Sequence, residues 1–504
     1  MRCSVVDGVE GTADPVTIPD AASLGGLEEA IGRLAPALEE FLAFDDVDRT
    51  MARRPEWLSA LQRPLPESGA GLQAVLDDLE QWIIPNGMRS PHPGFVAYII
   101  GRATTAPLAA SFAAQVAGHF RYFLTSFNFV EQLSLDWLAE LCRIAPGHYG
   151  VYSSGGSTAN LLAMGAARQA AFEGIGVDVG GDGLPGSIRG RIYGGTEVHH
   201  TIHRAAGVMG MGRHAYRAVE SDPAGHMDPA KLDEVLRQDR AAGILPVAVV
   251  AVAGATASGA VDDIARVADV AAAHGVWLHV DGAYGLPAAC LPELEDAFAG
   301  LDRADSVIVD PHKWLGTPTG CAATFVRDGT LLERAFTQDP APYLETFSPE
   351  TAESQFDDHG PHWYDRSIEL SSPSRGVWVW AVLREIGVDG LRQRIRRHVG
   401  FASHLAERAS EHPRLELLLP PSLSICCFRY KPDGADDATA DQVNERILQL
   451  LRAETPYIPS SARVSGRLAI RPCYVNPATT LAEVDGLADA VVEIGDRISG
   501  DRSR

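Results

Sequence analysis

The chain has 504 residues, a formal net charge of −23 at pH 7 and seven cysteines without a C-x-x-C motif. The length predicts two or three domains, and the acidic balance argues against nucleic acid or an anionic membrane surface as a partner, because both require a basic face. No apolar run approaches the roughly 20 residues that cross a bilayer, and the N-terminus lacks a signal-peptide pattern. The cysteines predict neither a disulfide framework nor a zinc ribbon. We therefore expect a cytoplasmic protein.

Three regions follow one another along the chain. Residues 1–85 are predicted to be a tail followed by helices, because apolar residues recur three or four apart from about residue 24. A Pro- and Gly-containing break, IPNGMRSPHPGF, then leads into a large α/β domain, which we place at 86–375. Residues 376–504 are predicted to be a smaller α+β domain, with strands at LSICCFRY and RLAIRPCYV and a helix near 441–453.

Seven short apolar runs, with helical segments between them, make up the middle of the chain: GVYSS, RIYGG, HAYRAV, PVAVVAVAGAT, VWLHVDG, SVIVDPH and AATFVR. Runs that are almost entirely apolar are typical of strands buried on both faces of a parallel sheet. Their alternation with helices predicts a doubly wound α/β domain. Polar residues follow these runs at Ser153 and Ser154, at Asp281 and at 310–313. Because ligands bind beyond the carboxyl ends of such strands, we expect one site there.

Lys313 is one of only three lysines in the chain, and it follows one of these runs. Partial burial at a strand end would lower the pKa of a lysine, and a neutral amine is a nucleophile suited to forming a Schiff base. The alternative interpretation is an ordinary surface lysine with a buried stem.

Asp281 ends the run VWLHVDG. A carboxylate in that position needs a partner. A protonated pyridine nitrogen is one suitable partner, since the aspartate would keep such a ring electron-accepting. A cap for the following turn is the competing interpretation.

Two further motifs are less specific on their own. In YSSGGSTANLL a strand ends in Gly155 and Gly156 and a helix begins, which suits one phosphate group better than a dinucleotide, although Gly/Ser turns are common. In GGTEVHHTIHRAAG, His199 and His203 are four apart and could share a helix face as zinc ligands. Since no third ligand is evident, we favour an imidazole stacked on a cofactor ring and expect no metal.

The phosphate cradle, histidine, aspartate and lysine occur in that order, and the motifs WLHVDGAYG and DSVIVDPHKWL resemble those of the group II pyridoxal-phosphate-dependent decarboxylases. That family includes aromatic-L-amino-acid, glutamate, histidine and diaminobutyrate decarboxylases, and the resemblance spans about residues 80 to 480. It implies the fold-type I architecture, a mostly parallel seven-stranded sheet flanked by helices, with pyridoxal 5′-phosphate (PLP) as cofactor. It also implies a homodimer with active sites at the interface and a dimerisation role for the N-terminal helices.

The resemblance further implies roles for individual residues. Lys313 would form the Schiff base with PLP, and Asp281 would pair with the pyridinium nitrogen. His199 would stack above the ring, and Ala283 would pack beneath it. The other cofactor contacts would be made by Gly155, Gly156, Ser157, Thr256 and His312.

In the family, the proton that completes the reaction is linked to a tyrosine on a mobile loop after the lysine. The corresponding loop here is TFSPETAESQFDDHGPHWYDRSIELSSPSR, which is long for a connection. Tyr364 is the best match to that tyrosine, and Tyr343 and His362 are alternatives.

Substrate contacts are implied at Phe95, Tyr98, Ile99 and Arg471, the last near the substrate carboxylate. Core packing is the competing interpretation for the first three. No charged subsite is evident, so the expected reaction converts an L-amino acid with an aromatic or apolar side chain into its amine and CO2. The alternatives are decarboxylation-coupled oxidative deamination to an aldehyde, other PLP carbon–carbon chemistry on the same frame, and a non-catalytic scaffold.

Overall fold

The computed structural model describes residues 26–43, 53–117, 125–336 and 363–500. The chain divides into two compact units, residues 1–89 and 90–504, and each is described by itself. Within the described ranges, no helix combines the length and the apolar character that a bilayer crossing requires.

The first unit is helical, as the spacing of its apolar residues predicts. Its helices are α1 (Leu27–Leu42), α2 (Arg54–Leu61) and α3 (Gly71–Asp78), and α3 continues into the π-helical turn η2 (Leu79–Ile83). Arg33 of α1 binds Glu80 of η2, with its Nε 2.8 Å from Oε1, and it also contacts Asp77. These ion pairs are partly exposed to solvent, which screens them, so each contributes little to the free energy of unfolding. The dimerisation role of this segment stays a proposal.

The second unit contains a seven-stranded sheet. Its strands are β2 (Tyr149–Ser153), β3 (Gly190–Gly195), β4 (Tyr216–Val219), β5 (Leu245–Val252), β6 (Trp277–Asp281), β7 (Ser306–Val309) and β8 (Ala322–Val326). They lie in the order β2-β8-β7-β6-β5-β3-β4, and β8 runs antiparallel to both of its neighbours while the other pairings are parallel. All seven predicted strands and the mostly parallel fold-type I architecture are confirmed.

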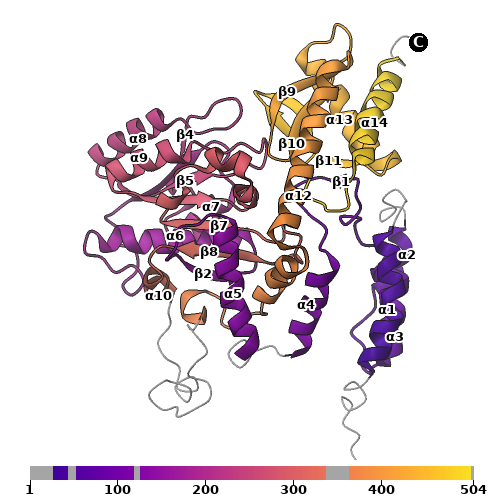
Figure 1. Ribbon diagram of the computed structural model, residues 1–504, viewed down its shortest axis with the longest axis horizontal. Coiled ribbons are helices and arrows are strands. Elements are labelled where there is room, and N and C mark those ends of the chain that lie inside the picture. Colours follow the sequence, from indigo (N-terminus) through magenta and orange to yellow (C-terminus); the bar gives the residue numbers. More distant parts are fainter. Residues whose placement is uncertain (1–25, 44–52, 118–124, 337–362, 501–504) are drawn as a thin grey trace, which may run out of the picture. The chain divides into compact units, whose positions relative to one another are not determined.

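Helices cover both faces of this sheet (Figure 1). They are α5 (Thr125–Leu141), α6 (Gly156–Glu173), α7 (Thr201–Val208), α8 (Pro229–Ala241), α9 (Ile264–His274) and α10 (Thr330–Phe336), with the short 3-10 helices η4 (Arg213–Ala215), η5 (Leu286–Cys290), η6 (Pro292–Phe298) and η7 (Leu301–Arg303). One core packs α5, α8 and α9 against the strands, and another packs α6 and α7 against them. Helix α9 follows its sequence signals closely: Asp263 caps it by accepting from the Arg266 N–H, and Gly275 ends it at a positive φ of 56°.

A five-stranded sheet forms the other part of the second unit. Its strands are β1 (Phe95–Val96), β9 (Leu415–Ser422), β10 (Ile425–Tyr430), β11 (Ile458–Val464) and β12 (Arg467–Arg471), in the order β1-β11-β12-β10-β9. The remaining helices of the second unit are α4 (Thr105–Ala117), η8 (Trp363–Arg366), α12 (Gly376–Glu411), α13 (Asp437–Glu454) and α14 (Leu481–Gly500). The sequence predicts β10, β12 and α13 but not the other three strands. The domain boundary at residues 375 and 376 stays a proposal, which the start of α12 at Gly376 supports.

Candidate functional site

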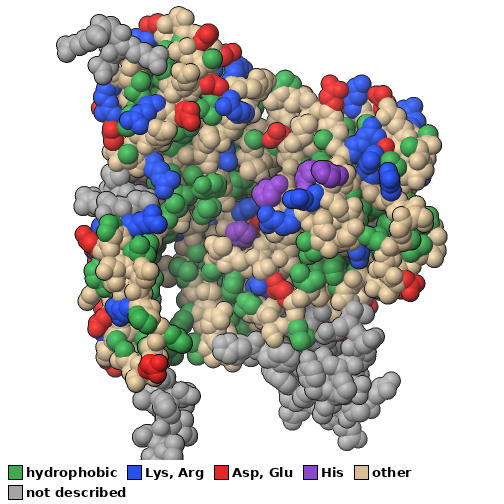
Figure 2. Space-filling model, turned by 180° about the vertical axis from the view of Figure 1, so that it is seen from behind, with side chains coloured by type: hydrophobic (Ala, Val, Ile, Leu, Met, Phe, Trp, Pro, Cys, Tyr) green, Lys and Arg blue, Asp and Glu red, His purple; other side chains and the backbone are tan. Residues whose placement is uncertain are grey.

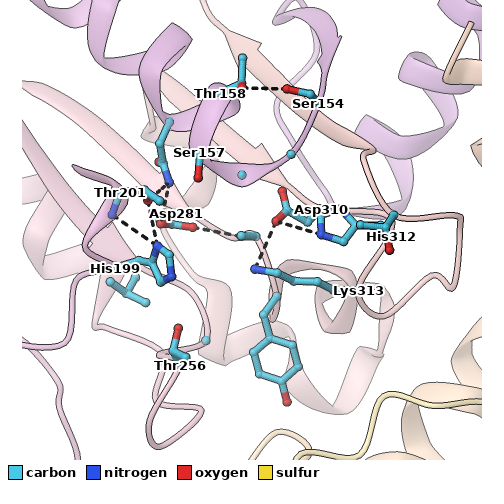
Figure 3. Close-up of a pocket in the computed structure, with 18 of the residues that line it drawn as sticks. Ser154, Ser157, Thr158, His199, Thr201, Thr256, Asp281, Asp310, His312 and Lys313 are labelled. Carbon is cyan, nitrogen blue, oxygen red and sulfur yellow. Dashed lines mark hydrogen bonds and ion pairs between the residues drawn. The ribbon is translucent and has the colours of Figure 1, made fainter. Parts of the chain in front are cut away.

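A cavity of about 360 Å³ lies where β2, β5, β6 and β7 end, on the carboxyl side of the parallel strands (Figure 3). This is the edge at which open α/β sheets bind ligands. All nine residues that the sequence suggests as cofactor contacts line this cavity: Gly155, Gly156, Ser157, His199, Thr256, Asp281, Ala283, His312 and Lys313. Residues up to 158 positions apart in the chain are therefore brought to one place, and their individual roles remain proposals.

Lys313 lies in the turn that follows β7. Its backbone N–H donates to the carbonyl oxygen of Asp310, at 2.9 Å, and its Nζ lies 3.2 Å from the Asp310 Oδ2. The Asp310 side chain is only 2% exposed, whereas that of Lys313 is 21% exposed. The sequence predicts a partly buried lysine at a strand end, and the structure pairs its amine with a buried carboxylate (Figure 3).

Asp281 is the last residue of β6, and its side chain is held from two directions. Oδ1 accepts from the Ala283 backbone N–H at 3.2 Å, and Oδ2 accepts from the Asn160 side-chain amide at 3.1 Å. The first contact is the turn cap that was the competing interpretation. The second comes from α6, so Asp281 is fixed between two elements and still lines the cavity.

His199 precedes α7 and also lines the cavity. Its Nδ1 lies 2.9 Å from the Thr201 hydroxyl, and burial lowers the pKa of the ring, so His199 is neutral at pH 7. Histidine side chains gather on one face of the molecule (Figure 2). His203, however, packs against the ring of Tyr216 with 4.2 Å between centroids. Among the residues described, no group of three or more His, Cys, Asp or Glu side chains is arranged to hold a metal ion.

The turn between β2 and α6 has the features of an anion site. Gly155 precedes the helix with φ 145°, and no side chain caps the first turn of α6. The unpaired backbone N–H groups in the first turn of the 18-residue helix α6 therefore lie at the cavity wall, where the helix dipole favours negative charge. A side chain larger than that of glycine does not fit at Gly156, because a Cβ there would lie 2.7 Å from the Asp310 Oδ2.

Replacing Gly156 with alanine is therefore expected to displace Asp310 and to distort the turn. We expect PLP binding to weaken by roughly tenfold or more, the effect of an overpacking strain of about 1–3 kcal/mol. Spectrophotometric titration with PLP measures this change. Gly400→Ala in α12 is the matched control, because a Cβ at Gly400 meets nothing within 4 Å, and it should bind PLP like the wild type.

Two residues that the sequence did not suggest brace this turn from outside. Glu369 accepts from the Ser154 backbone N–H at 3.0 Å, and Arg375 donates to Glu369 at 2.6 Å and to the Gly320 carbonyl at 2.8 Å. Asn160 and Thr201 are further cavity residues that were missed. Asp310 belongs to the polar group at 310–313 that the sequence places at the site, and it also lines the cavity.

The suggested substrate contacts lie elsewhere. Among the described residues that line the cavity, none is Phe95, Tyr98, Ile99 or Arg471. Phe95 is buried in β1 opposite Ile458, while the Tyr98 side chain is 60% exposed. Arg471 is buried and donates to the Tyr98 carbonyl at 2.6 Å. Their contact with a substrate stays a prediction.

The segment that follows α10 carries the suggested proton donors. Tyr343 and His362 lie outside the described residues. The backbone of Tyr364 belongs to η8, but its side chain also lies outside the described part of the structure. The assignment of the proton donor therefore stays a prediction.

Comparisons with known proteins agree with this geometry. The family described as "Pyridoxal-dependent decarboxylase conserved domain" matches residues 55–431. The chain is 27% identical to an aromatic-L-amino-acid decarboxylase of Bacillus atrophaeus over 446 residues, 87% of this chain and 88% of that one. It is 25% identical to a phenylacetaldehyde synthase of Petunia hybrida over 482 residues, 91% of this chain and 92% of that one.

A solved structure of Oryza sativa TDC with PLP and tryptamine resembles this chain with a TM-score of 0.84 at 25% identity, and the match covers 97% of this chain and 100% of that one. The family match extends over most of the chain and includes the turn after β2, the end of β6 and Lys313. The resemblance first suggested by two short motifs is thus confirmed over the whole fold. The chain belongs to the pyridoxal-dependent decarboxylase family, whose members are PLP-dependent carboxy-lyases acting on amino acids.

Proposed function

We propose that the protein decarboxylates an L-amino acid with an aromatic or apolar side chain, releasing the amine and CO2, with Lys313 as the residue that carries PLP. The observation that carries the proposal is the convergence of Lys313, Asp281 and His199 on one cavity that also receives the N-terminus of α6. Each of these groups has a separate use in PLP chemistry, and a scaffold without catalysis requires none of them.

The residues around the cavity fit PLP. The uncapped first turn of α6 suits its phosphate, the Asp281 carboxylate suits its ring nitrogen, and the neutral His199 ring provides a flat surface for stacking. When bound, PLP supplies an aldehyde that bonds to amino groups and a pyridinium ring that accepts the electron pair released with CO2.

Individual residues of the chain would have distinct roles in the rest of the reaction. Lys313 would hold the cofactor through Nζ and give way to the amino group of the substrate. Once released, Nζ would return to the buried Asp310 Oδ2, which lies 3.2 Å from it in the structure and stabilises its charge. Asp281 would hold a proton on the ring nitrogen, because its oxygens accept hydrogen bonds and its position between β6 and α6 is fixed.

The names of relatives support the aromatic preference. Matches include a tyrosine decarboxylase of Arabidopsis thaliana at 28% identity and a tryptophan decarboxylase of Oryza sativa at 29%. The similarity to a phenylacetaldehyde synthase favours a second candidate, in which decarboxylation is coupled to oxidation by O2 and yields an aldehyde, ammonia and hydrogen peroxide.

A panel of L-amino acids tests both candidates. The PLP-loaded protein is incubated with Phe, Tyr, Trp, Leu, Glu and 2,4-diaminobutyrate, and CO2, amine, aldehyde and hydrogen peroxide are measured for each. We expect CO2 and amine in equal amounts from an aromatic or apolar member. Equal amounts of aldehyde and peroxide would establish the second candidate instead, and CO2 release from Glu or diaminobutyrate alone would contradict the proposed substrate class.

We also propose a homodimer with active sites at the subunit interface, as the resemblance implies. Light scattering coupled to size-exclusion chromatography measures the mass directly. A particle of about twice the chain mass of 53.9 kDa is expected, and a monomer that retains full activity would contradict the proposal.

A further inference from the structure

A chain of buried hydrogen bonds joins Asp281 and His199 behind the cavity. At its centre is Asn160 of α6, whose amide Nδ2 lies 3.1 Å from the Asp281 Oδ2 and 3.1 Å from the Thr201 hydroxyl. On the other side, the Asn160 Oδ1 lies 2.9 Å from the His279 Nε2. Asn160 is 2% exposed and His279 is fully buried, so water does not compete for these contacts.

The orientation of the Asn160 amide follows from its partners. The Asp281 Oδ2 accepts hydrogen bonds, so the amide nitrogen and not the amide oxygen faces it. The oxygen then faces His279, and an oxygen can only accept. The Nε2 of His279 therefore carries a proton and donates it to Asn160.

The protonation of His279 fixes the next contacts. Burial lowers the pKa of His279 to about 4, so at neutral pH the ring is neutral and its Nδ1 has no proton. The Ser306 hydroxyl, 2.9 Å away, must donate to this Nδ1. Ser306 in turn accepts from the Trp277 indole N–H at 2.8 Å. Every donor along this branch points toward Asn160.

The branch on the other side of Asn160 ends at His199. The Thr201 oxygen accepts from the Asn160 amide, so its own hydroxyl proton is free to be donated to the His199 Nδ1 at 2.9 Å. The Thr201 backbone N–H points to the same nitrogen at 3.4 Å. An Nδ1 that accepts leaves the proton of the neutral ring on Nε2. One amide thus orders two side chains that line the cavity.

We propose that Asn160 is a positioning residue that sets the orientation of Asp281 and the tautomer of His199 together, and that His279 fixes the Asn160 amide. The inference rests on the proposed function for its catalytic meaning, because Asp281 is the group expected at the PLP ring nitrogen and His199 is the group expected above the ring. The hydrogen-bond chain itself belongs to the protein without cofactor. A merely structural polar cluster would contribute to stability but would not select a tautomer of His199.

A matched pair of substitutions at His279 tests the chain. In His279→Gln the side-chain amide nitrogen can still donate to Asn160, whereas in His279→Met a side chain of similar volume cannot. We expect His279→Met to bind PLP roughly ten- to hundredfold more weakly than the wild type, because an Asn160 amide that His279 no longer fixes loses its hydrogen bond to the charged Asp281. His279→Gln should stay within about threefold of the wild type, since a neutral donor is retained.

The second readout is the tautomer of His199 in the protein without PLP. Nitrogen-15 NMR of histidine-labelled protein distinguishes a protonated from an unprotonated ring nitrogen, and the His199 signals are assigned by their loss in His199→Gln. We expect one tautomer with the proton on Nε2 in the wild type and in His279→Gln, and a mixture of tautomers in His279→Met. Thr201→Val, with Thr201→Ser as its control, should produce the same mixture by cutting only the branch to His199.

The outcomes separate this inference from the proposed function. Suppose that the wild type binds PLP through Lys313, but that His279→Met and His279→Gln bind PLP equally well and both keep a single His199 tautomer. In that case Asn160 does not position Asp281 and His199. A wild-type His199 with its proton on Nδ1 would likewise overturn the inference. If instead the wild type binds no PLP while the His199 tautomer responds as expected, the hydrogen-bond chain stands and the proposed function fails. Should both His279 variants fail to fold, the Thr201→Val and Thr201→Ser pair decides the branch to His199.

Discussion

Lys313→Ala is expected to lower decarboxylation by roughly a thousandfold or more, as removal of a covalent catalytic group does in other enzymes. Alanine has no amine to hold PLP or to return after the substrate departs. It also leaves Asp310, at 2% exposure, without the Lys313 amine that pairs with it. The absorbance band of lysine-bound PLP should be missing, and CO2 release and the visible spectrum measure the two effects on one sample.

The control for this variant is another lysine. Lys231 of α8 is exposed and pairs with Glu234 at 3.3 Å, so Lys231→Ala should retain both the spectrum and the activity. The spectrum of each protein is compared after the same PLP loading. Full turnover by Lys313→Ala would show that the lysine has no covalent role.

Asp281→Asn is the second change with a large expected effect. The asparagine has the same shape, but it has no charge to hold a proton on the PLP ring nitrogen. Its N–H₂ group would also face a donor, either the Asn160 amide nitrogen or, if its oxygen turns toward Asn160, the Ala283 backbone N–H. We expect turnover to fall about 100- to 1000-fold, the scale for removing a preorganised electrostatic partner of the reacting group. Single-turnover CO2 release with saturating PLP measures the chemical step apart from cofactor loss.

Asp263→Asn is a suitable comparison for Asp281→Asn. Asp263 is exposed and caps α9, and asparagine caps helices about as well as aspartate does, so stability and turnover should both be unchanged. If Asp281→Asn also kept normal turnover with PLP bound, the ring nitrogen would not depend on this carboxylate.

The central strands of the large sheet could be predicted because they are buried on both faces. They are short apolar runs bounded by polar or turn residues, and β5, β7 and β8 are buried over almost their whole length. The small sheet gave weaker signals. Strand β9 has the sequence LELLLPPS, with two prolines and mixed burial, and β1 has only two residues, paired with a strand more than 350 positions away. Such pairings are set by tertiary contacts and not by local pattern.

The same distinction applies to the site. Lys313, Asp281 and the Gly155–Gly156 turn could be found because each follows a predicted strand at the binding edge of the sheet. Asn160 lies inside α6 and looks like an ordinary polar residue of a helix until its contact with Asp281, 121 positions away, is known. Glu369 contacts Ser154 across 215 positions. Residues that act by holding another residue have no local signature, so the fold is needed to find them.

Reduction of the PLP-loaded protein with borohydride, followed by peptide mass mapping, tests the central role of Lys313 most directly. Reduction makes the bond between PLP and its amine permanent, and the chain offers only Lys231, Lys313 and Lys431 besides its N-terminus. We predict one pyridoxyl group per chain, on the peptide that contains Lys313. A label on Lys231 or Lys431 instead, or no label after loading with PLP, would contradict the account.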